Sequence, residues 1–368
     1  MRIGYKRGVF DALTLRSGCV LPNRLAVAAM TNLQSLPDGQ LGDDELHWLV
    51  RRAEGGFGLV ATCAAYVARD GKAWDGELGV DSDDQLPGLA RLAARLRGAG
   101  AVGLVQLFHG GVRAASRLTG EPVWSASSWH EDRPGFEVPR AATLGDIARV
   151  IERFAEAAER AERAGFHGVE LHGAHGYLLS QFLSATMNPR SDGWGGDATG
   201  RARLIRETLR AVRARTSRGF TVGVRLSLED YGNARGLDLD EGIAVARALA
   251  DDGADFIHAS LWDAAKSTLK RPDQHAVTLL RAALPREVPI IAAGNVWTAA
   301  DARALVERGA DVVALGRAAI LNPDWPRRAH TPGWEPLRPP VTRAQLAERA
   351  VSPVFASYLT RWKNFVAT

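Results

Sequence analysis

The chain repeats one pattern eight times: a short apolar run is followed by a segment with the spacing of an amphipathic helix. The runs show no polar alternation, which is typical of parallel strands covered on both faces. Eight strand–helix units predict the α/β class and a closed (β/α)8 TIM barrel, because doubly wound open sheets usually contain fewer strands. The expected strands lie at 24–30, 57–63, 102–107, 168–172, 221–226, 256–260, 289–293 and 311–315.

Helical patterns fill the intervals between these strands, at 43–54, 86–98, 144–164, 201–215, 239–251, 275–283 and 298–308. Residues 1–20 predict a cap with a β-hairpin, and 343–362 predict a last amphipathic helix after a Pro-rich linker at 327–340. The sequence has no low-complexity tract, so we expect a single domain over 1–368. Two connections, 110–143 and 187–200, are longer than ordinary βα loops. Both follow strand C-terminal ends, so we expect them on the active face, with 110–143 influencing substrate choice.

The composition of the chain limits which binding partners and which cellular compartment are expected. The net charge is +4 and the charges are interspersed, which argues against nucleic acid as a partner. The two cysteines, Cys19 and Cys63, form no CxxC pair, which excludes a disulfide scaffold, a cysteine zinc site and an iron–sulfur cluster held by this chain. The first residues lack the apolar core of a secretion signal, and no run approaches 18 apolar residues. We therefore expect a cytoplasmic protein without a membrane span.

Strand C-terminal ends converge on one mouth in such a barrel, so the residues there are the candidate site. The stretch 168–183 places His172, His175 and Tyr177 just beyond a strand. The mouth has no carboxylate pair, no Ser-His-Asp set and no Schiff-base lysine, so it lacks the parts for glycoside hydrolysis, triad hydrolysis or aldolase chemistry. Its N–H and O–H donors suit a ligand rich in acceptors, such as a flavin, and a substrate that develops oxyanion character. The other strand-end candidates are Ala29, Met30, Thr31, Ala64, Gln106, Arg225, Gly294, Asn295, Gly316 and Arg317.

The last four of these residues follow the seventh and eighth strands. Small residues at these two positions leave backbone N–H groups free beside a helix start, which is where such barrels bind phosphate. Together with Arg317 they favour a phosphorylated ligand or cofactor.

Several of these features together resemble a known family. HGAHGYLLSQFL at 172–183, RSDGWGG at 190–196, Gln106, Arg225 and the closing GNV and GR occur in the order found in the Old Yellow Enzyme family of FMN-dependent ene-reductases. The similarity extends from Leu21 to Pro326. It implies that NADPH or NADH reduces FMN, which then passes hydride to the β-carbon of an activated alkene. A homo-oligomer is possible.

The resemblance also implies roles for the site residues. His172 and His175 would donate hydrogen bonds to the substrate oxygen, and Tyr177 would protonate the α-carbon. Gln106 and Arg225 would contact the flavin pyrimidine edge, and Thr31 the flavin C4 carbonyl. Ala29, Met30 and Ala64 would contact the flavin through their backbone, and Gly294, Asn295, Gly316 and Arg317 would bind the FMN phosphate.

The sequence departs from the family pattern at several positions. One branch of the family has Cys and Tyr where this chain has Thr31 and Leu33, so redox tuning and pocket shape should differ from that branch. The usual Tyr-Gly-Gly and Glu-Asn-Arg motifs read Trp194-Gly195-Gly196 and Thr199-Gly200-Arg201 here. We expect these changes to affect how the loop at 187–200 packs.

Other interpretations stay open at this point. His172, His175 and His109 could share a metal, although the usual carboxylate or cysteine help is missing, so we expect no metal. The histidines, Tyr177 and Arg225 could also be structural. A second FMN barrel, such as a tRNA dihydrouridine synthase, would need a cysteine acid and a basic helical tail. A non-catalytic flavin-binding protein would leave the donor set unused.

Overall fold

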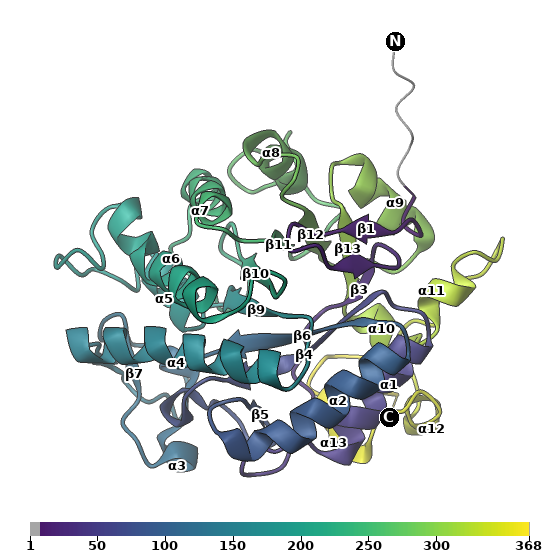
Figure 1. Ribbon diagram of the computed structural model, residues 1–368, viewed down its shortest axis with the longest axis horizontal. Coiled ribbons are helices and arrows are strands. Elements are labelled where there is room, and N and C mark those ends of the chain that lie inside the picture. Colours follow the sequence, from purple (N-terminus) through teal and green to yellow (C-terminus); the bar gives the residue numbers. More distant parts are fainter. Residues whose placement is uncertain (1–7, 368) are drawn as a thin grey trace.

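The strands of the computed structural model, which describes residues 8–367, close into one parallel barrel. Neighbouring strands pair in the order β3-β13-β12-β11-β10-β9-β6-β4, and the pairing of β3 with β4 closes the ring (Figure 1). The prediction of a (β/α)8 barrel is confirmed. Its strands are β3 (Leu25–Val27), β4 (Leu59–Tyr66), β6 (Val102–Phe108), β9 (Gly168–Gly173), β10 (Thr221–Leu226), β11 (Phe256–Ser260), β12 (Ile290–Ala293) and β13 (Val312–Leu315).

Helices surround the strands on the outside of the barrel (Figure 1). They are α1 (Asp43–Glu54), α2 (Leu86–Gly98), α4 (Leu144–Arg163), α6 (Ala198–Arg215), α7 (Leu239–Asp251), α8 (Ala276–Ala283), α9 (Ala299–Glu307) and α10 (Arg317–Leu321). Helix α4 shows why these segments are helical. Thr143 and Asp146 form a capping box at its start, and Ile147, Val150 and Phe154 form a buried stripe at helical spacing.

The predicted N-terminal hairpin is present and packs into the barrel. Strands β1 (Leu13–Thr14) and β2 (Val20–Leu21) pair antiparallel. Leu15 and Leu21 join an apolar cluster inside the barrel that includes Phe256. A Cβ at Gly223 would overlap the Phe256 ring, so the absence of a side chain there lets the ring fill the interior. The hairpin therefore covers the end of the barrel where the strands begin.

The single C-terminal helix predicted for 343–362 is wrong. The structure has two short helices, α12 (Arg343–Ala347) and α13 (Pro353–Leu359). Ala350 between them has a φ of 57°, and Pro353 lacks the N–H that a continuous helix would need. Ser352 then caps α13 through the N–H of Phe355. One more helical turn, α11 (Trp325–Arg328), ends two residues into the segment expected as a linker.

Short elements occupy the remaining connections. They are η1 (Arg69–Gly71), β5 (Leu78–Gly79), η2 (Asp83–Gln85), η3 (Gly111–Arg113), α3 (Ser116–Thr119), β7 (Trp124–Ser125), β8 (Arg140–Ala141) and α5 (Leu178–Leu183). The first two strands of the barrel depart most from their predicted bounds. The first ends at Val27, whereas the second continues to Tyr66 and pairs there with β5.

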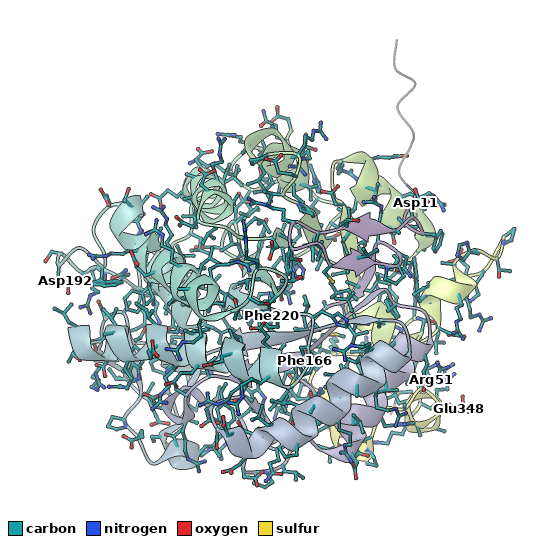
Figure 2. All side chains as sticks on the ribbon, viewed as in Figure 1. Asp11, Arg51, Phe166, Asp192, Phe220 and Glu348 are labelled. Atoms are coloured by element: carbon teal, nitrogen blue, oxygen red, sulfur yellow. The ribbon has the colours of Figure 1, made fainter. Side chains whose placement is uncertain are left out.

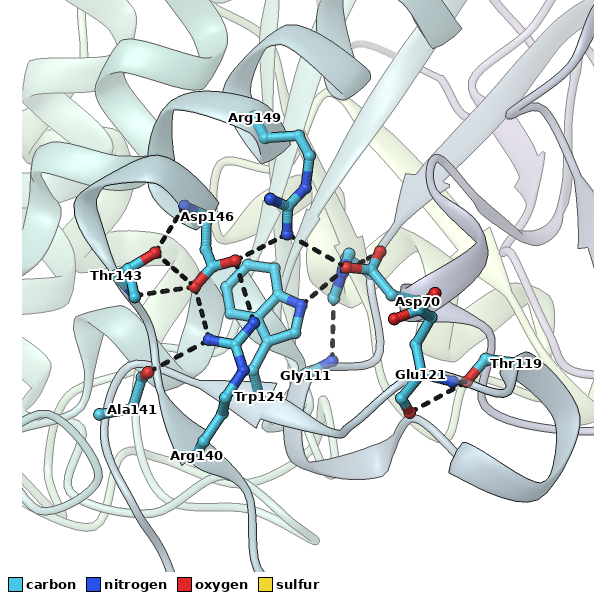
Figure 3. A network of polar contacts seen from close by, with 11 residues as sticks. Asp70, Gly111, Thr119, Glu121, Trp124, Arg140, Ala141, Thr143, Asp146 and Arg149 are labelled. Atoms are coloured by element: carbon cyan, nitrogen blue, oxygen red, sulfur yellow. Dashed lines mark hydrogen bonds and ion pairs between the residues drawn. The ribbon is translucent and has the colours of Figure 1, made fainter.

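A polar network anchors the long connection 110–143 to the barrel (Figure 3). Asp70 accepts a 2.9 Å hydrogen bond from Trp124 Nε1 and lies 3.6 Å from Arg149 Nη2. Arg149 also contacts Asp146, which forms a two-point ion pair with Arg140. These contacts tie both ends of the connection to η1 and α4, which fixes its course.

Polar and apolar side chains are distributed as burial requires. In Figure 2, Asp11, Asp192 and Glu348 lie at the periphery, whereas Phe166 and Phe220 lie inside the fold and are buried. Between residues 8 and 367, we find no helix with the length and apolar character needed to cross a membrane.

Candidate active site

A cavity of about 570 Å³ opens at the C-terminal ends of the barrel strands. This volume is in the range of small-molecule and cofactor sites. Every residue predicted for the site lines it, although the residues come from seven different strand ends. They are Ala29, Met30, Thr31, Ala64, Gln106, His172, His175, Tyr177, Arg225, Gly294, Asn295, Gly316 and Arg317.

His172 lies near the end of β9, and His175 follows it three residues later. His172 is buried, and its Nδ1 accepts a 3.3 Å hydrogen bond from the backbone N–H of Ala174. In the neutral ring the proton therefore lies on Nε2. His175 has a φ of 60°, a left-handed conformation that costs a non-glycine residue about 1–2 kcal/mol and is often found at functional sites. This turn sets the two rings edge to face, with centroids 4.9 Å apart.

Both imidazoles are neutral donors at neutral pH. Burial lowers the pKa of His172 well below its usual value, and His175 and Arg225 lower it further. Burial likewise lowers the pKa of His175, with Arg225 and His258 as additional causes. A neutral imidazole carries one N–H, so each ring can donate one hydrogen bond without bringing a charge into the cavity.

Tyr177 stands beside them at the start of α5. Its ring packs edge-on against Phe108, with centroids 4.5 Å apart, and lies 5.0 Å from the ring of His172. Burial raises the pKa of its phenol, and the negative charge of Glu77 raises it further. Tyr177 therefore stays protonated over the working range of an ordinary enzyme and can act as an acid.

Arg225 brings a buried cation to the cavity wall at the end of β10. Its Nη2 donates to Ser260 Oγ at 3.1 Å and its Nη1 to the Ala29 carbonyl at 3.4 Å. Its Nε is buried and has no hydrogen-bond partner within residues 8–367. The guanidinium as a whole lines the cavity, where a cation can interact with an acceptor group of a bound ligand.

A buried carboxylate that the sequence interpretation missed lies beneath the cavity. Glu170 on β9 accepts 2.7 Å hydrogen bonds from Gln106 Nε2 on β6 and from His258 Nδ1 on β11. Burial alone would raise the pKa of Glu170, but His258, Arg225 and Gln106 hold it below its usual value. Burial and Arg225 lower the pKa of His258, so this ring is a neutral donor. A carboxylate only accepts hydrogen bonds, so Glu170 fixes the amide orientation of Gln106.

One signal in the sequence could have identified Glu170. It lies two residues before His172 in an otherwise apolar strand, so both side chains face the same side of the sheet. The contact with His258 depends on strand register across β10, which the sequence alone does not provide.

Replacing Glu170 with Leu is expected to destabilise the protein by about 3–5 kcal/mol, because His258 and Gln106 would lose their buried acceptor. Urea denaturation at pH 7 measures this change. Because the pKa of Glu170 is depressed, its contribution is complete above the usual carboxyl pKa of about 4.3 and is lost as pH falls below it. The gap between wild type and variant should therefore shrink on acidification. Glu152→Leu, at an exposed ion pair with Arg215, is the matched control and should leave stability close to that of the wild type.

Comparison with known proteins identifies the family to which this chain belongs. Residues 8–332 match the model of the NADH:flavin oxidoreductase / NADH oxidase family. The chain belongs to this family. A Bacillus subtilis protein named "Probable NADH-dependent flavin oxidoreductase YqiG" is 36% identical over 324 residues, which cover 86% of either chain. An NADPH dehydrogenase of Clostridium acetobutylicum is 32% identical over 318 residues, 86% of this chain and 92% of that one.

Solved structures give the same result. Morphinone reductase in complex with tetrahydroNAD superimposes with a TM-score of 0.78 and 27% identity, covering 92% of this chain and 94% of that one. The Old Yellow Enzyme homologue from Zymomonas mobilis gives a TM-score of 0.77 and 26% identity, covering 87% and 92%. The chain is an Old Yellow Enzyme family member, and the resemblance seen in the sequence is confirmed. It is therefore a flavin oxidoreductase that uses a nicotinamide reductant.

In this flavin oxidoreductase, the ends of β12 and β13 lie together as predicted. Arg317 Nη2 donates to Asn295 Oδ1 at 2.7 Å, which joins the two strand ends. A Cβ at Gly294 would lie 2.8 Å from the Leu261 carbonyl oxygen, so only glycine fits this packing. Asn295 has a φ of 52°, a conformation that asparagine tolerates better than most residues.

The two long loops contribute nothing to the cavity wall, and their place on the active face and the influence of 110–143 on substrate choice stay predictions. None of the described residues in 110–143 or 187–200 lines the cavity. Arg113, near the predicted mouth, is held by a two-point ion pair with Glu131 inside the first loop. The polar network that includes Asp70 and Asp146 fixes that loop against η1 and α4.

The C-terminal segment lines the cavity instead. The residues involved are Phe355, Tyr358, Leu359, Trp362 and Phe365. Tyr358 of α13 and Thr31, which follows the first strand, both line this cavity. The sequence predicted a helix in the C-terminal segment, but none of that segment's residues was predicted to be part of the site. Trp262 and Trp297, which follow β11 and β12, also line the cavity, and Trp262 is 65% exposed at its edge.

Two other candidates take structural positions. His109 lies 3.3 Å from Asp70 and accepts from the Gly111 backbone, away from the cavity-lining histidines. Within the part of the chain that the structure describes, no three His, Cys, Asp or Glu side chains are placed to hold a metal ion. Cys63 is buried in the apolar core, and burial raises the pKa of its thiol, as expected for a small core residue.

Proposed function

We propose that this protein is an FMN-dependent ene-reductase that uses NADH or NADPH to reduce activated alkenes. The observation that carries the proposal is the placement of two neutral imidazole donors beside a protonated phenol in one cavity. Such a set can stabilise negative charge on a carbonyl or nitro oxygen and deliver a proton next to it. The name of a Vibrio harveyi relative, NADH:acrylate oxidoreductase, supports this substrate class; it is 31% identical over 330 residues, which cover 87% of this chain and 33% of that protein.

The residues present fit FMN. The guanidinium of Arg225 and the amide of Gln106, oriented by Glu170, would contact the pyrimidine edge of the ring. Backbone groups at Gly294 and Gly316 and the cation of Arg317 would hold the phosphate. When bound and reduced, FMN supplies the hydride for the β-carbon of the alkene.

The chain's own groups would complete the reaction. His172 and His175 bind the substrate oxygen and hold the alkene in place, and their N–H groups stabilise the negative charge that develops on it. Tyr177 gives its phenolic proton to the α-carbon and recovers a proton from solvent. The aromatic wall formed by the C-terminal segment keeps water from the reacting atoms and accepts an apolar substrate body.

Purified protein is expected to be yellow, and heat should release FMN that co-migrates with an authentic standard. Under anaerobic conditions NADH or NADPH should bleach the colour, and cyclohexenone should restore it. Colourless protein that FMN does not reconstitute, or bleached protein that no enone or nitroalkene reoxidises, would contradict the proposal. The first result argues against the cofactor, and the second against the substrate class.

A further inference from the structure

Three side chains form a short relay along the cavity wall. Arg225 Nη2 donates to Ser260 Oγ at 3.1 Å, and the same oxygen lies 2.7 Å from His175 Nε2. Ser260 is buried at the end of β11, and Arg225 is buried at the end of the neighbouring strand β10. Strand pairing between β10 and β11 fixes this arrangement, since Arg225 is the register partner of His258, two residues before Ser260.

Counting hydrogens favours one direction for the relay. A guanidinium can only donate, so Ser260 Oγ accepts from Arg225. The serine has one hydrogen to give, and among the described residues its only other hydrogen-bond partner is His175 Nε2. If Nε2 instead carried the proton, Ser260 would accept twice, and its own hydrogen would have no acceptor among the described residues and could point only into the cavity that Ser260 lines.

We propose that Ser260 is a positioning residue that donates to His175 Nε2 and thereby fixes this histidine with its proton on Nδ1. His172 has the opposite arrangement, because the Ala174 backbone N–H donates to its Nδ1 and leaves the proton on Nε2. The two rings thus offer different nitrogens as donors. Two different supports, a serine hydroxyl and a backbone amide, set the two tautomers.

The tautomer of His175 matters for the reaction. This step of the inference rests on the proposed function. A His175 ring in the other tautomer would have a bare acceptor at Nδ1, which would repel the oxygen of an enone. In addition, the Arg225 cation polarises the serine hydroxyl along the chain of hydrogen bonds. Ser260 would therefore affect the binding of the substrate oxygen without touching the reacting carbons.

Nitrogen NMR of the oxidised protein labelled with ¹⁵N-histidine tests the proposal directly. Two-bond proton–nitrogen correlations separate protonated from unprotonated ring nitrogens, and loss of one set of signals in His175→Asn assigns the ring. We expect a protonated Nδ1 and an unprotonated Nε2 for His175. In Ser260→Ala both shifts should move toward averaged values, whereas Ser260→Thr, which keeps the hydroxyl, should restore the wild-type pattern.

Ser227 provides a matched control, because it contacts the backbone of His175 and not its ring. Ser227 Oγ accepts from the His175 backbone N–H at 3.1 Å, so Ser227→Ala should leave the ring tautomer unchanged. The His172 signals should stay constant in Ser260→Ala. We expect Ser260→Ala to slow enone reduction on the order of tenfold, less than the hundredfold or more for outright loss of an oxyanion donor.

Two results would overturn the inference: a wild-type His175 protonated on Nε2, or an unchanged tautomer in Ser260→Ala. Both are independent of the cofactor and of turnover. Protein that shows the Nδ1 tautomer but neither binds FMN nor reduces enones would instead contradict the proposed function and leave the role of Ser260 intact. Folding of each variant is checked by its melting temperature.

Discussion

Replacing Tyr177 with Phe is expected to slow reduction of cyclohexenone by a factor on the order of 10²–10⁴, the usual contribution of a general acid. Reduction of the flavin by NADH or NADPH needs no proton at the α-carbon and should stay close to the wild-type rate. The ring of Tyr177 packs against Phe108, and phenylalanine keeps that contact, so the fold should be unaffected. Anaerobic stopped-flow absorbance measures the two half-reactions separately.

The pH profile provides a second check on Tyr177. Burial and Glu77 raise the pKa of its phenol, so the acid stays protonated beyond the usual tyrosine value of about 10. Enone reduction should therefore show no loss of rate from this group between neutral and moderately alkaline pH. Tyr231→Phe is the matched control, because it removes a tyrosine hydroxyl that donates to Glu229 and does not line the cavity. An equal loss in both half-reactions, or in both variants, would show that Tyr177 is not the acid.

The sequence predicts the barrel well because each strand is an uninterrupted apolar run between helices with clear amphipathic spacing. The register between strands, as in the pairing of Gln106 with Glu170, is seen only in the structure. Prediction is weaker where tertiary contacts decide the ends of elements. The first strand stops at Val27, and the last helix is interrupted before Pro353.

The same reasoning explains which site residues the sequence could identify. Residues at strand ends, such as His172 and Arg225, can be predicted because parallel strands end at one face. The relay through Ser260 and the support from Glu170 depend on side chains that meet across neighbouring strands, and spacing along one strand carries no such information. The C-terminal wall was missed because a helix that packs against the barrel and one that lines its mouth have the same apolar stripe.

Replacing His172 with Ala is expected to lower kcat/KM for cyclohexenone on the order of 10²–10³-fold, because one of the two oxyanion donors is lost. His175→Ala should have an effect of similar size. Both rings would bind one oxygen, so the double variant should lose less than the product of the two single losses. His130→Ala, at an exposed histidine of the loop 110–143, is the control and should behave as wild type.

Half-reaction kinetics decide whether the histidines act on the substrate or on the fold. As oxyanion donors, they should affect reoxidation of the reduced flavin by enone far more than its reduction by NADH or NADPH. A structural role would lower the melting temperature and slow both half-reactions together. Strictly multiplicative losses in the double variant would show that His172 and His175 act at different points, and would contradict a shared oxyanion site.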